Sequence, residues 1–297
     1  MAEAAPARAA LRPADVDALA AAYRSGARTP VQVIDACLAA SRDADRVDPP
    51  LRAVILRTDE AARRAAEASA ARWRAGQPLS VLDGVPVLVK DNLDLAGLVT
   101  SNGTRLPFPP AARDARAVER LRAAGAVIVG KANLHEIGAG TSGINPHHGT
   151  PRNPWDDRRW CGGSSSGSAC AVGAGLVPLA IGTDAGGSVR APASLVGAVG
   201  LKPTFGRISR LGLSIVCDTI DHIGPITHSC LDAARALVAM AAVEADDDET
   251  WDQPPLPAPA AALAEVARPL DAAPALRIGV ARHLFDHPRV EPEVGAA

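Results

Sequence analysis

Lys90 is a residue whose type and position could support chemistry. It ends an apolar run, residues 85–89, that follows Gly84 and is typical of a short buried strand. An amine at the end of such a strand is partly desolvated, which lowers its pKa and lets it act as a general base at neutral pH. A salt bridge to Asp91 or to another acid is the alternative interpretation.

A Gly- and Ser-rich segment further along the chain supplies hydroxyl groups. Its sequence is Cys161-Gly162-Gly163-Ser164-Ser165-Ser166-Gly167-Ser168, and it runs directly into an apolar, helix-like stretch at residues 169–172. A flexible linker is one interpretation, although linkers join domains and this segment enters an apolar one. A phosphate-binding loop is not supported, because the pattern GxxxxGK[ST] is missing and no lysine follows.

The third segment, Gly182-Thr183-Asp184-Ala185-Gly186-Gly187-Ser188-Val189-Arg190, follows a strand predicted over residues 178–181. A serine after two glycines at a strand end suits a nucleophile on a tight turn, where backbone N–H groups can point at a developing oxyanion. A simple turn is the alternative. The GxSxG elbow of His-based hydrolases is not present, since Arg190 stands where its last glycine is needed. The stretch Asn145-Pro146-His147-His148-Gly149 is a candidate lining of a substrate cleft, with a packing or surface role for His147 and His148 as the favoured interpretation.

Together, and in this order along the chain, the three segments resemble the amidase signature family. Its hallmark Gly-Gly-Ser-Ser-x-Gly-Ser is present at residues 162–168, and its Gly-(Thr/Ser)-Asp-x-Gly-Gly-Ser-(Ile/Val)-Arg at residues 182–190. The flanking stretches are similar as well: Gly130-Lys131-Ala132-Asn133, Pro151-Arg152-Asn153-Pro154-Trp155, Gly200-Leu201-Lys202-Pro203-Thr204 and Asp221-His222-Ile223-Gly224-Pro225. The resemblance is dense over residues 82–230 and looser elsewhere.

The resemblance implies a Ser–Ser–Lys site in place of Ser–His–Asp, with no cofactor and no metal. Ser188 is then the nucleophile, Ser164 follows a cis peptide bond and relays the proton, and Lys90 is the base. An oxyanion hole is implied at the backbone N–H groups of Ala185, Gly186, Gly187 and Ser188. Hydrogen bonds that brace the two loops are implied for Ser165, Asp184 and Arg190.

The elements that must position these residues indicate an α/β fold. Helix signals fill residues 1–75: Thr29 and Pro30 form an N-cap pair, and an Ala- and Arg-rich helix over residues 60–75 stops at Gly76. A helix over residues 117–124 precedes an apolar strand over 126–129, an alternation typical of α/β architecture. The resemblance implies a central mixed, mostly parallel sheet flanked by helices. We predict an N-terminal helical segment, 1–75, packing on an amidase signature domain, 76–297.

Composition narrows the classes of function. The chain has 297 residues, of which 47% are hydrophobic, and a formal net charge of −2. A sizeable core can form, and without excess positive charge neither nucleic acid nor a membrane is an expected partner. Five scattered cysteines without metal-binding spacing predict reduced thiols in a cytoplasmic protein. The acidic run at residues 246–249 is expected to be a solvated loop.

The C-terminal end departs from the family. A strand is expected over residues 276–281 and a helix beginning at Pro292, whereas complete members continue with further helices and strands. The signature domain is therefore predicted to be incomplete at its C-terminal end. We expect a truncated product, in preference to a second chain that supplies the rest or an unusually small variant.

The resemblance implies a general amidase that cleaves a small-molecule carboxamide to a carboxylate and ammonia or an amine, with a homodimer left open. One alternative is the glutaminase component of a tRNA-dependent amidotransferase, in which a partner subunit makes most tRNA contacts. Another is a catalytically incompetent remnant. The stretch Gly140-Thr141-Ser142-Gly143-Ile144-Asn145-Pro146 is more similar to general amidases than to the glutaminase component.

Overall fold

The computed structural model describes residues 15–255 and, beyond them, only single residues and short pieces between residues 263 and 288. Two units can be distinguished by their internal contacts, Met1–Val266 and Ala267–Ala297, and the elements below belong to the first. The strand predicted over residues 276–281 lies, apart from single residues, outside the described part of the chain, and the helix predicted at Pro292 lies wholly outside it.

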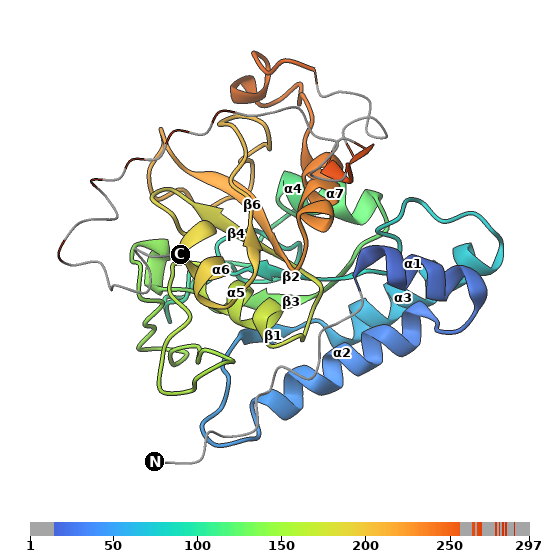
Figure 1. The fold of residues 1–297 in the computed structure, drawn as a ribbon, viewed down its shortest axis with the longest axis horizontal. Coiled ribbons are helices and arrows are strands. Elements are labelled where there is room, and N and C mark those ends of the chain that lie inside the picture. The colour runs from blue at the N-terminus through green and yellow to red at the C-terminus, as the bar shows by residue number, and fades with distance from the viewer. Residues whose placement is uncertain are drawn as a thin grey trace. The chain divides into compact units, whose positions relative to one another are not determined.

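A six-stranded mixed sheet forms the centre of the first unit (Figure 1). Its spatial order is β1 (Val54–Arg57), β3 (Val127–Ala132), β2 (Pro86–Lys90), β4 (Leu179–Asp184), β6 (His222–Thr227) and β5 (Val199–Gly200). Strand β2 is parallel to both of its neighbours, β3 and β4, whereas β1, β6 and β5 each pair in the antiparallel sense. Every residue of β2, β3 and β4 is buried, as expected for inner parallel strands covered on both faces.

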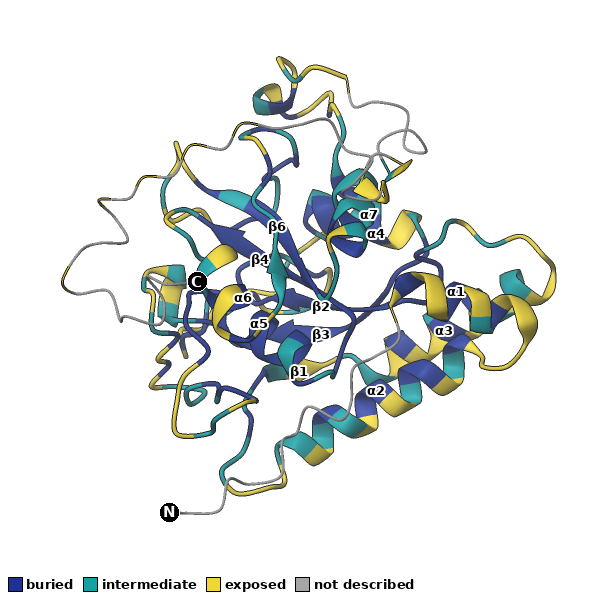
Figure 2. Ribbon diagram, viewed as in Figure 1, coloured by how far each residue is buried: buried dark blue, intermediate teal, exposed yellow. Residues whose placement is uncertain are grey.

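Helices cover the two faces of this sheet. Their bounds are α1 (Val16–Ser25), α2 (Pro30–Ala44), α3 (Asp59–Arg74), α4 (Arg116–Ala123), α5 (Ser166–Gly173), α6 (Arg190–Leu195) and α7 (Cys230–Met240), with short 3-10 helices η2 (Glu136–Gly138) and η3 (Asp248–Thr250). One hydrophobic cluster joins α2, α3 and α5 to Leu88, and the other joins α1, α4 and α7 to Val87 and Val89. Successive residues of β2 thus face opposite helical layers. The inner strands of the sheet are buried (Figure 2). The predicted α/β fold with a mixed sheet is confirmed.

The N-terminal helices begin where the sequence predicts, but the segment is not wholly helical. Thr29 accepts a hydrogen bond from the Gln32 backbone N–H at 3.2 Å, and the Gln32 side chain accepts one from the Thr29 N–H at 2.9 Å. This capping box starts α2. The expectation of helix throughout residues 1–75 is wrong at β1, which pairs with β3. A strand of four residues is too short to show a periodicity in the sequence. It forms because it pairs with β3 at the edge of the sheet.

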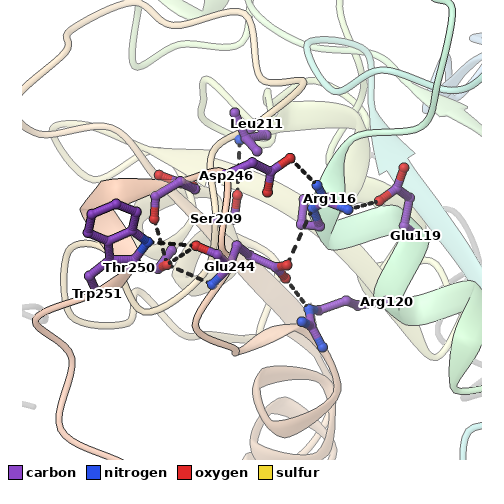
Figure 3. A network of polar contacts seen from close by, with 10 residues as sticks. Arg116, Glu119, Arg120, Ser209, Leu211, Glu244, Asp246, Thr250 and Trp251 are labelled. Atoms are coloured by element: carbon purple, nitrogen blue, oxygen red, sulfur yellow. Dashed lines mark hydrogen bonds and ion pairs between the residues drawn. The ribbon is translucent and has the colours of Figure 1, made fainter.

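The segment that follows α7, residues 244–249, forms ion pairs with arginines of other elements. Glu244 lies 3.6 Å from Arg116 of α4 and also contacts Arg120 (Figure 3). Asp246 lies 2.6 Å from Arg116, and Glu249 pairs with Arg210. The prediction of a solvated acidic loop is wrong for Asp247, which is buried, and for Glu249, which is half-buried against Arg210, whereas Asp246 and Asp248 are exposed as expected. Within the described residues, no helix is long and apolar enough to cross a membrane.

Candidate active site

Lys90 lies at the carboxyl end of β2, next to the carboxyl end of its parallel neighbour β4. Its side chain is fully buried, and its Nζ lies 2.7 Å from Ser164 Oγ and 2.7 Å from Thr183 Oγ1. Parallel strands end at the same edge of a sheet, so this arrangement follows from the strand order. The lysine therefore contacts two hydroxyl groups inside the protein.

Burial lowers the pKa of Lys90 to about 7, and the negative charges of Asp221 and Asp184 oppose that shift. The alternative of a salt bridge to Asp91 is wrong, since Asp91 Oδ1 pairs with Lys131 Nζ at 2.8 Å. Among the described residues, no carboxylate lies within ion-pair distance of Lys90. A large fraction of the amine is consequently neutral near pH 7, as a general base requires.

Ser164 lies in the turn that leads into α5. The peptide bond between Gly163 and Ser164 is cis, as the resemblance implied. A Cβ built on Gly163 would come within 2.7 Å of the Gly143 backbone nitrogen, so only glycine fits there. Residues 161–172 are all buried, and the interpretation of this segment as a flexible linker is therefore wrong. The turn is instead packed between the loop around Gly143 and the sheet.

The Ser188 turn is folded around the buried carboxylate of Asp184. Asp184 accepts hydrogen bonds from the backbone N–H groups of Gly187 at 2.8 Å and Val189 at 3.1 Å, and forms a two-point ion pair with Arg190 at 2.8 and 3.0 Å. Burial alone would raise the pKa of Asp184, but Arg190 and these N–H groups outweigh it and lower the pKa to about 2. The ionised carboxylate therefore holds the turn together.

Contacts between the two serine loops come from Ser165 and Ser188. The Ser165 backbone N–H donates to the Ser188 carbonyl at 3.2 Å. The Ser165 hydroxyl donates to the Thr183 carbonyl and accepts from the Thr183 N–H, both at 3.2 Å. Ser188 is half-buried, and its hydroxyl makes no hydrogen bond to any residue that the structure describes. The structure thus brings Lys90, Ser164 and the Ser188 turn to one place and leaves the Ser188 hydroxyl accessible.

The N–H groups predicted for the oxyanion hole are not equivalent. The Gly187 N–H already donates to Asp184, whereas those of Ala185 and Gly186 make no hydrogen bond to a described residue. Gly186 is exposed and Ala185 half-buried, so both groups can meet a ligand at the surface of the turn. The Ser188 N–H likewise makes no hydrogen bond to a described residue, so Ala185, Gly186 and Ser188 are stronger candidates than Gly187 on this geometry.

Thr183 and Asn92 also belong to the site, although the sequence did not single them out. Thr183 Oγ1 contacts Lys90, and the Asn92 side-chain amide lies 3.0 Å from the same oxygen. Both residues stand inside recognised segments, next to Asp184 and two positions after Lys90, and this adjacency was the only available signal. His147 instead contacts Glu136 at 2.8 Å, and His148 lies 3.3 Å from the Thr104 carbonyl. Among the described residues, no group of three His, Cys, Asp or Glu side chains could hold a metal ion.

Replacing Asp184 by asparagine should destabilise the fold. The charge-assisted bonds lost are worth about 1.5–3 kcal/mol. A carboxylate with a lowered pKa contributes stability above its unfolded pKa of about 3.9 and loses that contribution as the pH falls. The loss seen for Asp184→Asn should therefore be full at pH 7 and shrink as the pH falls towards the folded value of about 2. Urea unfolding across this range measures it.

Asp43→Asn is the control for this comparison. Asp43 forms an exposed ion pair with Arg46, so its replacement should change stability by less than about 1 kcal/mol. A loss for Asp184→Asn that was equal at pH 7 and at pH 2 would contradict the assignment of an ionised Asp184 to the turn.

Comparison with known proteins identifies the family of the chain. The family model described as Amidase matches residues 35–297. The chain is 42% identical over 286 residues to the glutamyl-tRNA(Gln) amidotransferase A subunit of Chloroflexus aggregans, covering 95% of this chain and 56% of that protein. It is 40% identical over 240 residues to the fatty acid amide hydrolase of Oryza sativa subsp. indica, covering 80% of this chain and 40% of that one.

Among solved structures, the peptide amidase of Stenotrophomonas maltophilia is similar with a TM-score of 0.78 and 39% identity. The match covers 82% of this chain and 51% of the peptide amidase. The chain thus spans about half the length of the relatives it matches. The matched region contains β2, the Ser164 turn and the Ser188 turn. On these grounds the chain belongs to the amidase signature family.

Proposed function

We propose that the protein hydrolyses a carboxamide C–N bond through an acyl intermediate on Ser188. The observation that carries this proposal is Lys90, a buried amine with a pKa lowered to about 7 and an Nζ 2.7 Å from Ser164 Oγ. A buried lysine without a carboxylate partner is costly for a fold, and a neutral amine beside a hydroxyl is what base catalysis needs. The family to which the chain belongs supports the same reaction class.

In the proposed first step, neutral Lys90 takes the Ser164 proton while Ser164 takes the Ser188 proton. Ser188 Oγ then attacks the amide carbon, and the N–H groups of Ala185 and Gly186 stabilise the oxyanion. The proton returns from Lys90 through Ser164 to the leaving nitrogen, the C–N bond breaks, and ammonia or an amine departs. Water then attacks the acyl group by the same proton route, releasing the carboxylate and restoring Ser188.

A second candidate is the glutaminase component of an amidotransferase. The 42% identity to the Chloroflexus aggregans protein, over 95% of this chain, favours it. The similarity to a peptide amidase and to a fatty acid amide hydrolase supports a general amidase instead. We favour the general amidase, with a small-molecule linear amide as substrate, on the stretch Gly140-Thr141-Ser142-Gly143-Ile144-Asn145-Pro146.

Ammonia release by the 297-residue chain tests the proposal. Glutamine, an alkyl carboxamide and a peptide with a C-terminal amide should be compared, with Ser188→Ala as the inactive control. We expect release from the alkyl or peptide amide that Ser188→Ala lacks and that EDTA leaves unchanged. Release from glutamine alone would favour the amidotransferase component. No release from a folded chain would support the remnant.

A further inference from the structure

Two hydroxyl groups compete for the lone pair of Lys90. Ser164 Oγ and Thr183 Oγ1 each lie 2.7 Å from Nζ. A neutral amine carries two N–H groups and one lone pair, so one hydroxyl can donate to the nitrogen while the other accepts from it. Only when Ser164 is the donor can Lys90 take its proton. A Thr183 hydroxyl that donated to the lone pair would block the base.

Asn92 is the residue that can decide between these arrangements. Its side-chain amide lies 3.0 Å from Thr183 Oγ1, and the residue is almost fully buried. The structure places Nδ2 towards Thr183, and the other amide atom, Oδ1, is buried and has no hydrogen-bond partner among the described residues. The oxygen and nitrogen of an amide have nearly the same shape, so their assignment rests on the hydrogen bonds that each can make.

We propose that Asn92 presents its carbonyl oxygen to Thr183, and that Thr183 is thereby a positioning residue that turns the Lys90 lone pair towards Ser164. With its one proton donated to Asn92, the Thr183 hydroxyl can only accept, and Lys90 donates an N–H to it. The remaining N–H and the lone pair are then left for Ser164. The exchange gives the Asn92 carbonyl and the Thr183 proton each other as partners, and it moves the Asn92 N–H groups to the position at which Oδ1 has no partner among the described residues.

This inference rests on the proposed function, because it concerns the direction of the first proton transfer. If it is right, the effects of substitutions at Asn92 and at Thr183 depend on each other. Thr183→Val removes the hydroxyl and its competition together. Asn92→Leu leaves the hydroxyl but frees its proton to reach the Lys90 lone pair. The loss from Asn92→Leu should therefore match or exceed the loss from Thr183→Val.

The experiment is a double-mutant cycle on the rate at which a fluorophosphonate labels Ser188 in the 297-residue chain. We expect each single variant, Thr183→Val and Asn92→Leu, to lose about 10- to 100-fold in labelling rate, the range that a hydrogen bond to a charged group is worth. The double variant should lose no more than Thr183→Val alone, because Asn92 then has no hydroxyl to orient. Losses that multiply would overturn the proposal.

Two further measurements separate positioning from a merely structural role. Thr183→Ser keeps the hydroxyl and should retain the wild-type rate within about threefold. Thr183→Val removes an acceptor from protonated Lys90, so the pH at which labelling rises should move to lower values. Thr227→Val, a buried threonine on β6 whose hydroxyl donates to the Ser229 carbonyl, is the matched control and should alter neither rate nor pH profile.

The outcomes for this inference and for the proposed function can be told apart. A wild-type chain that is folded by circular dichroism but not labelled contradicts the proposed function itself. A wild-type chain that is labelled, with Thr183→Val and Asn92→Leu folded and labelled at the wild-type rate, overturns only the positioning role. If Thr183→Val fails to fold, the comparison of Asn92→Leu with Thr183→Ser still decides, since an unaffected Asn92→Leu contradicts the proposal.

Discussion

A fluorophosphonate should add once to the wild-type chain and not at all to Ser188→Ala. The Ser188 hydroxyl is free of hydrogen bonds to the described residues and stands on a half-buried turn. Ser164, Ser165 and Ser168 are instead buried, in α5 and the loop that precedes it. Only an activated and accessible serine reacts with such a probe. Intact-protein mass spectrometry before and after exposure measures the adduct.

Ser194→Ala is the matched control for this experiment. Ser194 is exposed on α6, and its hydroxyl donates to the Ala191 carbonyl at 2.8 Å. The adduct should persist in this variant. An adduct that also persisted in Ser188→Ala would place the nucleophile elsewhere. A folded wild-type chain without an adduct would mean that the matched half of the family's length does not assemble a working site.

The rate of labelling should rise with pH through about 7 and then level off. Burial lowers the pKa of Lys90 to about 7, and only the neutral amine can accept the Ser164 proton. Below this value the rate should fall about tenfold for each pH unit, because the neutral fraction falls in that proportion. A lysine with the ordinary pKa of about 10.4 would show the rise more than about three units higher.

Lys90→Met should lower the labelling rate by about 100- to 10,000-fold and remove the pH dependence. Methionine fills a similar volume in the buried site without an amine, so the fold should be retained.

Asp221→Asn should move the rise in labelling rate to lower pH, because the charge of Asp221 opposes the lowering of the Lys90 pKa. A profile that Lys90→Met leaves intact would exclude Lys90 as the base, whereas a rise only near the ordinary lysine pKa of about 10.4 would contradict the lowered pKa.

What the sequence determined by itself was local. The glycines and serines of residues 162–168 and 182–190 mark two turns, because these residue types are favoured in turns. The start of α2 followed from Thr29 and Pro30, and the buried strand β2 from its apolar run. These features predicted the α/β class and singled out Lys90, the Gly- and Ser-rich segment and Ser188, since caps, turns and buried strands depend on a few adjacent side chains. The roles of the site residues were implied by the resemblance to the amidase signature family.

What the tertiary structure alone decided was the choice of partner between distant residues. Asp91 pairs with Lys131 rather than with the adjacent Lys90, and Glu249 with Arg210. Strand β1 lies in a segment with helical signals on both sides, and it forms because it pairs with the edge of β3. Thr183 reached Lys90 through the parallel pairing of β2 with β4. Such contacts depend on strand order, register and burial, which arise only when the whole sheet has assembled, so no local pattern could specify them.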